Sequence, residues 1–91
     1  MSNILHNTAL PCFELNLEGH RCVLDYTLRG NVMTITHTGV PSELGGRGLA
    51  AELTKFALNH AQAQGWKVIP QCSYAEVYIK KHPEYAALLN A

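Results

Sequence analysis

Three glycines interrupt the stretch Val40-Pro41-Ser42-Glu43-Leu44-Gly45-Gly46-Arg47-Gly48-Leu49-Ala50. The segment before it, Val32–Thr38, is rich in β-branched residues and predicts a strand. From Leu49 onward, apolar residues recur at steps of three and four, which predicts a helix. Glycine permits positive φ and close approach of a ligand, and the first turn of a helix leaves N–H groups unpaired. The stretch therefore predicts a site for a phosphate or pyrophosphate, to which Arg47 adds a positive charge. A plain strand-to-helix turn fits the spacing equally well.

Two earlier segments also have the composition of strands. Cys12–Leu17 alternates loosely between apolar and polar residues, and Arg21–Leu28 is rich in aliphatic, aromatic and β-branched residues. Short turns separate these two segments from each other and from Val32–Thr38. We therefore expect three antiparallel strands joined as hairpins.

The second half of the chain changes to a helical period. The helix that begins at Leu49 should end near Gly65, and Lys67–Cys72 predicts a fourth strand, roughly parallel to the third. A second helix is expected from Ser73 to His82-Pro83, with a last short helix after it. The predicted fold class is α/β: a mixed, mostly antiparallel sheet with a long helix after the third strand and one or two C-terminal helices.

Length and charge narrow the function classes. We expect residues 1–91 to form a single domain, because a chain of this length has room for one small core. Seven Lys and Arg balance seven Asp and Glu, so the chain lacks the basic surplus of a general nucleic-acid binder. It has neither an apolar run of ~20 residues nor a secretory signal pattern. We therefore expect a cytoplasmic protein that binds neither membranes nor nucleic acid.

The cysteines give no sign of a disulfide or a metal site. Cys12, Cys22 and Cys72 form no CxxC pair, and without a secretory signal they are expected to be reduced. Together with the five histidines they never reach the spacing of zinc ligands. No metal site is predicted.

The glycine loop resembles a known motif. The GNAT superfamily of acyl-CoA-dependent N-acetyltransferases carries Gln/Arg-x-x-Gly-x-Gly/Ala at a strand-to-helix junction. The run Gly45–Ala50 matches the last three positions and has glycine at the first. The order of segments from Thr36 to Tyr85 is also similar to that of small single-domain GNAT-like proteins, so the resemblance covers nearly the whole chain. It implies a GNAT-like fold, acetyl-CoA as co-substrate and N-acetyl transfer to an amine.

The resemblance also implies roles for individual residues. The pyrophosphate of coenzyme A would be held by the main-chain N–H groups of Gly45, Gly46, Arg47, Gly48, Leu49 and Ala50. The pantetheine arm would pair with the backbone of Thr38, Gly39 and Val40. The strand Lys67–Cys72 would splay away and leave a cleft for the thioester. Cys72 would lie at the end of that strand, and Tyr78 would protonate the departing thiolate.

The chain departs from these relatives at Gly39, where the small group usually has a glutamate that could act as a general base. His37 lies two residues earlier on the same face of the expected strand. It is the best substitute, because an unperturbed histidine titrates near neutral pH. Plain structural roles remain open for all three catalytic candidates: core packing for Cys72 and Tyr78, and a hydrogen-bonded strand position for His37.

The acceptor and the assembly are less defined. A chain this small has few residues with which to wall off a deep pocket, which favours an exposed amine on a protein or peptide. Two other functions remain open: a CoA-binding module with little or no catalysis, and an interaction domain that only keeps the fold. Free sheet edges are compatible with a monomer or a homodimer.

Overall fold

A single five-stranded sheet, covered on one face by helices, forms the framework of the molecule. The computed structural model describes residues 4–89. Its strands are β1 (Ile4–Asn7), β2 (Cys12–Leu17), β3 (His20–Arg29), β4 (Val32–Gly39) and β5 (Lys67–Pro70). Its helices are α1 (Leu49–Gln64), α2 (Ser73–Lys81) and two short 3-10 helices, η1 (Ser42–Leu44) and η2 (Pro83–Leu88).

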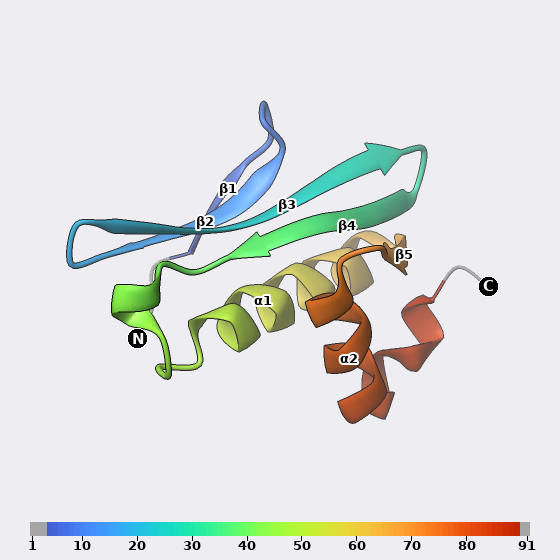
Figure 1. Cartoon of the computed structure of the whole chain (residues 1–91). Coiled ribbons are helices and arrows are strands. Elements are labelled where there is room, and N and C mark those ends of the chain that lie inside the picture. The colour runs from blue at the N-terminus through green and yellow to red at the C-terminus, as the bar shows by residue number, and fades with distance from the viewer. Residues whose placement is uncertain (1–3, 90–91) are drawn as a thin grey trace.

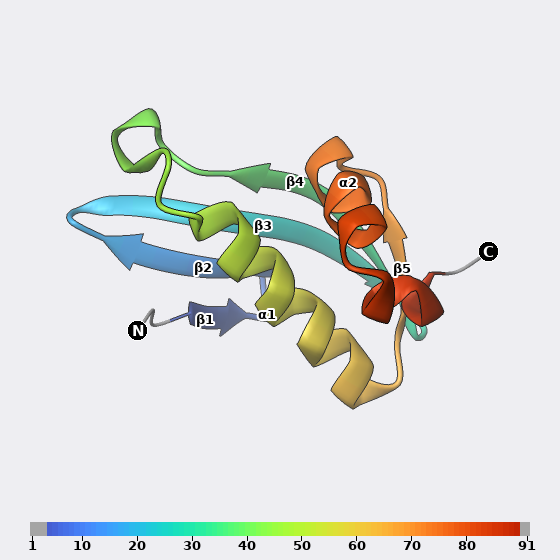
Figure 2. The same cartoon turned by 90° about the horizontal axis from the view of Figure 1, so that it is seen from below.

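The strands lie in the order β1-β2-β3-β4-β5. The first four pair antiparallel, and β5 joins the edge parallel to β4. Figures 1 and 2 show α1 crossing the underside of the sheet diagonally, with α2 beside it beneath β4 and β5. Within residues 4–89, the other face of the sheet carries no helix. The predicted fold class is confirmed.

Two elements differ from the expectation. The strand β1 was not foreseen; it pairs with β2 from Ile4↔Leu15 to Asn7↔Cys12, so the long helix follows the fourth strand along the chain. The strand β5 ends at Pro70 instead of continuing to Cys72. Proline lacks an N–H group and cannot donate to a ladder, which explains its place at the end of an edge strand.

The core lies between the sheet and α1. Leu53, Ala57, Leu58 and Ala61 of α1 are fully buried against the inner face of the sheet. A buried threonine, Thr54, satisfies its hydroxyl by donating to the carbonyl of Ala50 at 2.8 Å. Within residues 4–89, no helix is long and apolar enough to cross a membrane.

A β-bulge in β4 changes which side chains face the core. Asp25 pairs with His37 but Tyr26 pairs with Ile35, so Thr36 is an extra residue on β4. Ile35 points into the core before the bulge, and the next inward position is Thr38, opposite buried Leu24. Because side chains alternate along a strand, His37 and Gly39 lie on the open face of the sheet.

An aromatic cluster joins the N-terminal hairpin to α1. The ring of His6 stacks on Phe13 with centroids 4.2 Å apart and meets the edge of His60 at 4.7 Å. Nε2 of His6 also hydrogen-bonds the hydroxyl of Tyr26. His60 in turn meets the edge of Trp66 at 5.2 Å. These five residues, hereafter the aromatic cluster, pack β1 against α1.

The cluster makes stability depend on pH. Burial, and to a lesser degree the charge of His60, lower the pKa of His6 from its ordinary 6.5. The folded state therefore prefers neutral His6, so its contribution is complete above pH 6.5 and is lost as the pH falls below that value. We expect the free energy of unfolding, measured with urea between pH 7.5 and 5.0, to fall in that window. His6→Gln should flatten the fall.

The control is His20→Gln, which removes a histidine at the start of β3, outside the cluster. It should keep the wild-type pH dependence. An unchanged slope in His6→Gln would contradict this account.

Candidate active site

The glycine loop is anchored by its 3-10 turn and then winds through left-handed backbone. Leu44 is 1% exposed and packs in the core, while the N–H of Gly45 donates to the carbonyl of Ser42 at 3.1 Å. Gly46 and Gly48 follow with φ of 80° and 72°. Residues with a Cβ rarely adopt this conformation, so the path of the loop depends on glycine at these two positions.

The first turn of α1 presents unpaired N–H groups. Its first intrahelical bond runs from the N–H of Glu52 to the carbonyl of Gly48 at 3.0 Å. The N–H groups of Leu49, Ala50 and Ala51 therefore precede the first helical bond, and no side chain caps them. Together with the helix dipole they form a partly positive surface suited to an anion.

A cavity of about 270 Å³ lies in front of this helix end. Its wall includes six of the predicted residues: Val40, Gly45, Gly46, Gly48, Leu49 and Ala50. The structure thus brings together the end of β4, the loop and the start of α1, as the sequence suggested. Thr38, Gly39 and Arg47 do not line this cavity.

Arg47 instead ties the loop to the β2–β3 turn. Its Nη1 lies 2.6 Å from Oε2 of Glu18, and its Nη2 lies 3.2 Å from Oε1. The hydrogen bond and charge of each partner raise the pKa of Arg47 and lower the pKa of Glu18. In this arrangement the guanidinium holds the loop in place, and the anion surface comes from the backbone.

The strands β4 and β5 separate after Ile35 and Pro70. Their parallel pairing runs from Val32↔Lys67 to Ile35↔Pro70, and the N–H of Cys72 then donates to the carbonyl of Ile35 at 2.9 Å. In the part of the chain that the structure describes, Thr36–Gly39 has no strand beside it on the β5 side. Backbone groups along this edge are therefore free to pair with an extended ligand.

Cys72 lies immediately before α2, at the opening between β4 and β5 where the two strands have separated. Its Sγ is 3.7 Å from Oγ1 of Thr38. Thr38 faces the helix side of the sheet because of the bulge at Thr36. Burial acts to raise the pKa of the Cys72 thiol, but hydrogen bonds from the backbone of Ala75 and from the side chain of Thr38, with smaller ones from Tyr74, outweigh burial. The net result is a pKa below the ordinary 9.0. A thiol at a helix N-terminus is in the setting that favours the thiolate.

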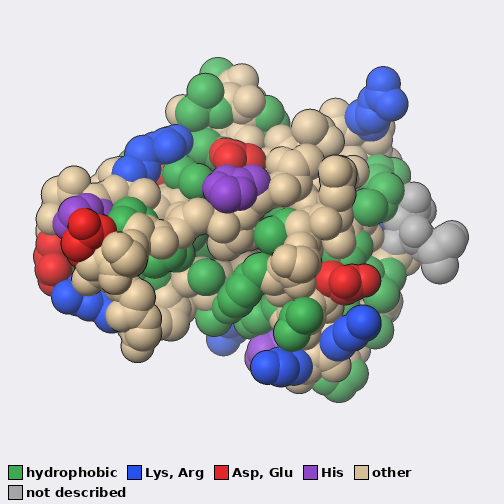
Figure 3. Space-filling model, viewed as in Figure 1, with side chains coloured by type: hydrophobic (Ala, Val, Ile, Leu, Met, Phe, Trp, Pro, Cys, Tyr) green, Lys and Arg blue, Asp and Glu red, His purple; other side chains and the backbone are tan. Residues whose placement is uncertain are grey.

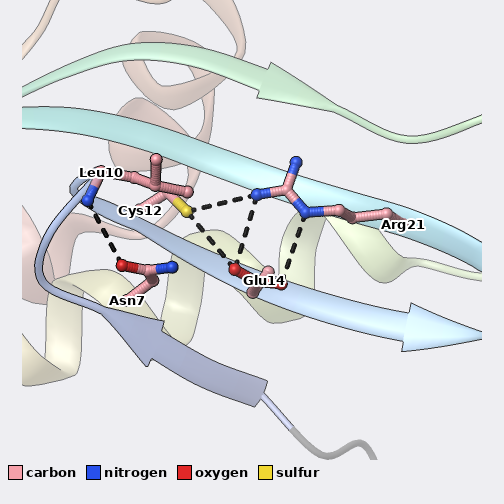
Figure 4. A network of polar contacts seen from close by, with 5 residues as sticks. All are labelled: Asn7, Leu10, Cys12, Glu14 and Arg21. Atoms are coloured by element: carbon pink, nitrogen blue, oxygen red, sulfur yellow. Dashed lines mark hydrogen bonds and ion pairs between the residues drawn. The ribbon is translucent and has the colours of Figure 1, made fainter.

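The other two cysteines are in opposite surroundings. Cys12 is fully buried in the polar network of Figure 4, with Sγ 3.8 Å from Oε2 of Glu14 and 3.6 Å from Nη2 of Arg21. Burial, followed by the charge of Glu14, raises the pKa of Cys12, and burial raises the pKa of Cys22. Of the three free thiols, Cys72 is the one whose pKa is lowered.

Two tyrosines of α2, Tyr74 and Tyr78, lie one turn apart with ring centroids separated by 6.4 Å. Tyr78 is 8% exposed, and its ring stacks on His82 with centroids 4.0 Å apart. Burial, and then the charges of Tyr85 and Tyr74, raise the pKa of Tyr78, so its phenol keeps its proton at neutral pH. Tyr74, one turn earlier and 40% exposed, lines the glycine-loop cavity. The sequence analysis missed Tyr74, although its i, i+4 spacing to Tyr78 was a usable signal.

His37 is not beside the thiol. It lies on the open face of the sheet, across from Asp25, whereas Thr38 faces Cys72 on the helix side. The imidazole folds over Gly39: a Cβ added at Gly39 would lie 2.9 Å from Nε2 of His37. The structure therefore groups Thr38 with Cys72 and separately groups His37 with Gly39. The catalytic role expected of His37 stays a prediction.

Known proteins are similar to this chain in sequence and fold. Residues 12–88 match the family described as GCN5-related N-acetyltransferase. The chain belongs to the GCN5-related N-acetyltransferase family. It is 35% identical over 81 residues to Protein NATD1 of Mus musculus and to Protein NATD1 of Homo sapiens, covering 86% of this chain and 74% and 72% of theirs.

A solved structure of this family agrees with the fold. The solution structure of a GCN5-like candidate N-acetyltransferase from Staphylococcus aureus superposes with a TM-score of 0.76 at 29% identity, covering 96% of this chain and 86% of that one. GCN5-related N-acetyltransferases generally use acetyl-CoA. Among residues 4–89, no group of three His, Cys, Asp or Glu side chains could hold a metal ion.

The thiol environments predict an order of reactivity. With iodoacetamide at pH 7.5, we expect Cys72 to be alkylated at least about tenfold faster than Cys12 or Cys22, because the thiolate is the nucleophile. Peptide mass spectrometry over a time course measures the three rates. Thr38→Val should slow the reaction of Cys72, since it removes one hydrogen bond that lowers the pKa of the thiol. Thr34→Val, on the same strand, should leave the rate unchanged.

Proposed function

We propose that this chain is an acyl-CoA-dependent N-acetyltransferase that binds acetyl-CoA and transfers the acetyl group to an amine. One observation carries the proposal: the end of β4 and the start of α2 both line the anion cavity and both contribute to the contact at the Cys72 thiol. Val40 and Tyr74 form part of the cavity wall, and two residues before each of them, Thr38 and Cys72 contact one another. The end of β4 and the start of α2 thus form a continuous path from the glycine loop to the opening between the strands.

Acetyl-CoA would lie along this path in a single orientation. Its pyrophosphate would be held by the backbone N–H groups of the loop and of the first turn of α1, in the run Gly45–Ala50. Its pantetheine arm would pair with the free edge of β4 at Thr38, Gly39 and Val40. Its thioester would then reach Thr38 and Cys72, where the two strands have separated.

The acceptor would approach from the open face of the sheet. The opening lies beside β4, so a partner could reach it from either face of the sheet. In the part of the chain that the structure describes, the open face carries no helix that would exclude a bulky partner. In the view of Figure 3, acidic and basic side chains are scattered over the surface, and hydrophobic side chains lie over α1 and α2. An exposed amine on a protein or peptide suits such an open approach better than a small molecule in a deep pocket.

The transfer itself needs a base and an acid. The amine nitrogen attacks the thioester carbonyl, His37 accepts the proton that the nitrogen loses, and the carbon–sulfur bond breaks. The departing thiolate of coenzyme A takes a proton from the phenol of Tyr78, whose raised pKa keeps it protonated. Cys72 would either orient the thioester or accept the acetyl group before the amine does, and an acetylated Cys72 peptide would distinguish the second course.

The space over Gly39 supports His37 as the base. In the small relatives a glutamate usually stands at this position, and here Nε2 of His37 lies 2.9 Å from the point where the Cβ of such a residue would be. The imidazole is therefore next to the space that a glutamate side chain at this position would begin to fill. We propose that the pair of Gly39 and His37 replaces that carboxylate.

A second candidate is a CoA-binding module with little or no catalysis. The absence of a carboxylate at Gly39 is the observation that favours it. It shares the cofactor site with the first candidate and differs only in the acid–base step, so binding and turnover must be measured separately.

The binding site predicts a charge effect at the start of α1. Calorimetric titration of the reduced protein with acetyl-CoA should show saturable binding. Ala50→Glu should weaken it by about tenfold or more (~1.4 kcal/mol), because a carboxylate beside the first-turn N–H groups repels the pyrophosphate. A carboxylate is favourable at a helix N-terminus, so the fold should persist.

Ala63→Glu makes the same change at an exposed position at the other end of α1 and should bind like wild type. Equal loss in both variants would remove the loop from the account. No binding to a folded wild type at millimolar acetyl-CoA would remove both the transferase and the CoA-binding module.

The role of His37 as the base can be tested by removing its side chain and placing a glutamate at position 39. We expect His37→Ala to lower the rate of acetyl transfer to a lysine-containing peptide by roughly 10²-fold, the lower range for losing a general base. The double variant His37→Ala with Gly39→Glu should regain part of the rate. The acidic limb of its pH–rate profile, where the base becomes protonated, should move to lower pH, because a glutamate titrates below a histidine.

The single variant Gly39→Glu is the control, since its Cβ would collide with Nε2 of His37. It should bind acetyl-CoA without gaining rate. A wild-type rate in His37→Ala would exclude His37 as the base. If wild type and all variants bind acetyl-CoA but none transfers the acetyl group, the CoA-binding module is favoured.

A further inference from the structure

A second and larger cavity lies at the opposite end of α1. Its volume is about 620 Å³, within the range typical of small-molecule sites. Its wall includes His6, Tyr26, Leu28, His60, Gln64 and Trp66. It lies on the helix side of the sheet, where β1 and its turn approach the C-terminal half of α1.

This cavity is separate from the proposed acetyl-CoA site. His60 lies twelve residues beyond Gly48 along α1, which corresponds to roughly 18 Å at 1.5 Å per residue. The two cavities share no lining residue. A ligand in the larger cavity therefore needs neither the glycine loop nor the opening between β4 and β5.

The wall of the cavity is held in place by the aromatic cluster. The ring of His6 is fixed by stacking on Phe13 and by its hydrogen bond to the Tyr26 hydroxyl. The ring of Trp66 meets the edge of His60 at 5.2 Å and lies 6.4 Å from Tyr26. A preformed wall lowers the ordering cost of binding.

The chemistry of the wall selects the ligand. No Asp, Glu, Lys or Arg lines the cavity, so a fully charged ligand would lose water without gaining a partner. Four rings line the cavity, and flat rings favour stacked or edge-on contact with another ring. The amide of Gln64 and the hydroxyl of Thr8 can hydrogen-bond one polar group.

An extended peptide fits less well. The N–H of Tyr26 donates to the carbonyl of Pro11 at 3.3 Å on the β2 side of β3. Because backbone groups alternate along a strand, Leu28 is the next residue to point toward that side. β3 ends at Arg29, so Leu28 is the last residue of this strand that could pair there, too short an edge for strand addition.

We propose that this cavity is a second ligand site, for a small, uncharged, planar aromatic molecule with one hydrogen-bonding group. Benzamide is the probe. Because Trp66 is the chain's sole tryptophan, its indole N–H signal in a ¹⁵N–¹H NMR spectrum reports on the cavity without ambiguity. Benzamide should shift this signal saturably, with a Kd of about 1 mM as expected for a fragment of its size.

Matched probes test the selectivity. Benzoate has the same ring with a charge, and cyclohexanecarboxamide has the same amide without the flat ring; each should bind at least about fivefold more weakly. The variant Gln64→Phe fills the wall and should weaken benzamide about tenfold or more. The control Gln62→Phe places the same ring on an exposed part of α1 that does not line the cavity, and should bind like wild type.

Each contrary result overturns the proposal. Benzamide that shifts the amides of Gly45–Ala50 instead of the Trp66 indole would be using the glycine loop. Equal binding of cyclohexanecarboxamide would exclude an aromatic preference, and binding of a capped Val-Phe-Val peptide without binding of benzamide would mark a strand-addition site. None of these binding measurements uses acetyl-CoA, so their outcome does not depend on the proposed transferase activity.

Discussion

The hydrogen bond from the N–H of Cys72 to the carbonyl of Ile35 is the last backbone hydrogen bond between β4 and the segment that follows β5. Pro70 ends the parallel ladder just before it, and Ser73 begins α2 just after it. Beyond this point β4 continues to Gly39 with a partner on the β3 side and none on the β5 side in the described part of the chain. The free edge, the half-buried Thr38 and the position of the Cys72 thiol all depend on this separation.

The helix α1 connects that opening to the rest of the molecule. Its N-terminus forms the anion surface behind the glycine loop, its buried face fills the core, and its C-terminal half carries His60 beside the second cavity. The loop takes its path from glycines at positive φ and its position from the pair of Arg47 and Glu18. Backbone groups therefore form the site, while side chains fix where that backbone lies.

Much of this was predictable because it depends on local pattern. The strand–glycine loop–helix junction and the end of α1 at Gly65 follow from residue type and period, and the structure has them there. The strand β1 was missed because it spans only four residues, with Ile4 and Leu5 adjacent instead of alternating; its pairing with β2 defines it. The partner of Arg47 could not be foreseen, since Glu18 is 29 residues away along the chain.

The bulge at Thr36 was the most consequential feature hidden from the sequence. A strict alternation would put His37 and Ile35 on one face, but a single extra residue places them on opposite faces. His37 and Gly39 remain on one face with each other, so the expected substitution of one for the other survives this change. The bulge is defined by how β3 and β4 pair, so the sequence of either strand by itself does not reveal it.

The most direct measurement of the central claim is a map of backbone amide shifts on addition of coenzyme A to the ¹⁵N-labelled protein. A cofactor bound by the loop and the free edge of β4 should shift the amides of Gly45–Ala50 and of Thr38–Val40 together, with smaller effects around Cys72. Shifts confined to the surroundings of His60 and Trp66, or shifts in the loop without any along β4, would contradict the account.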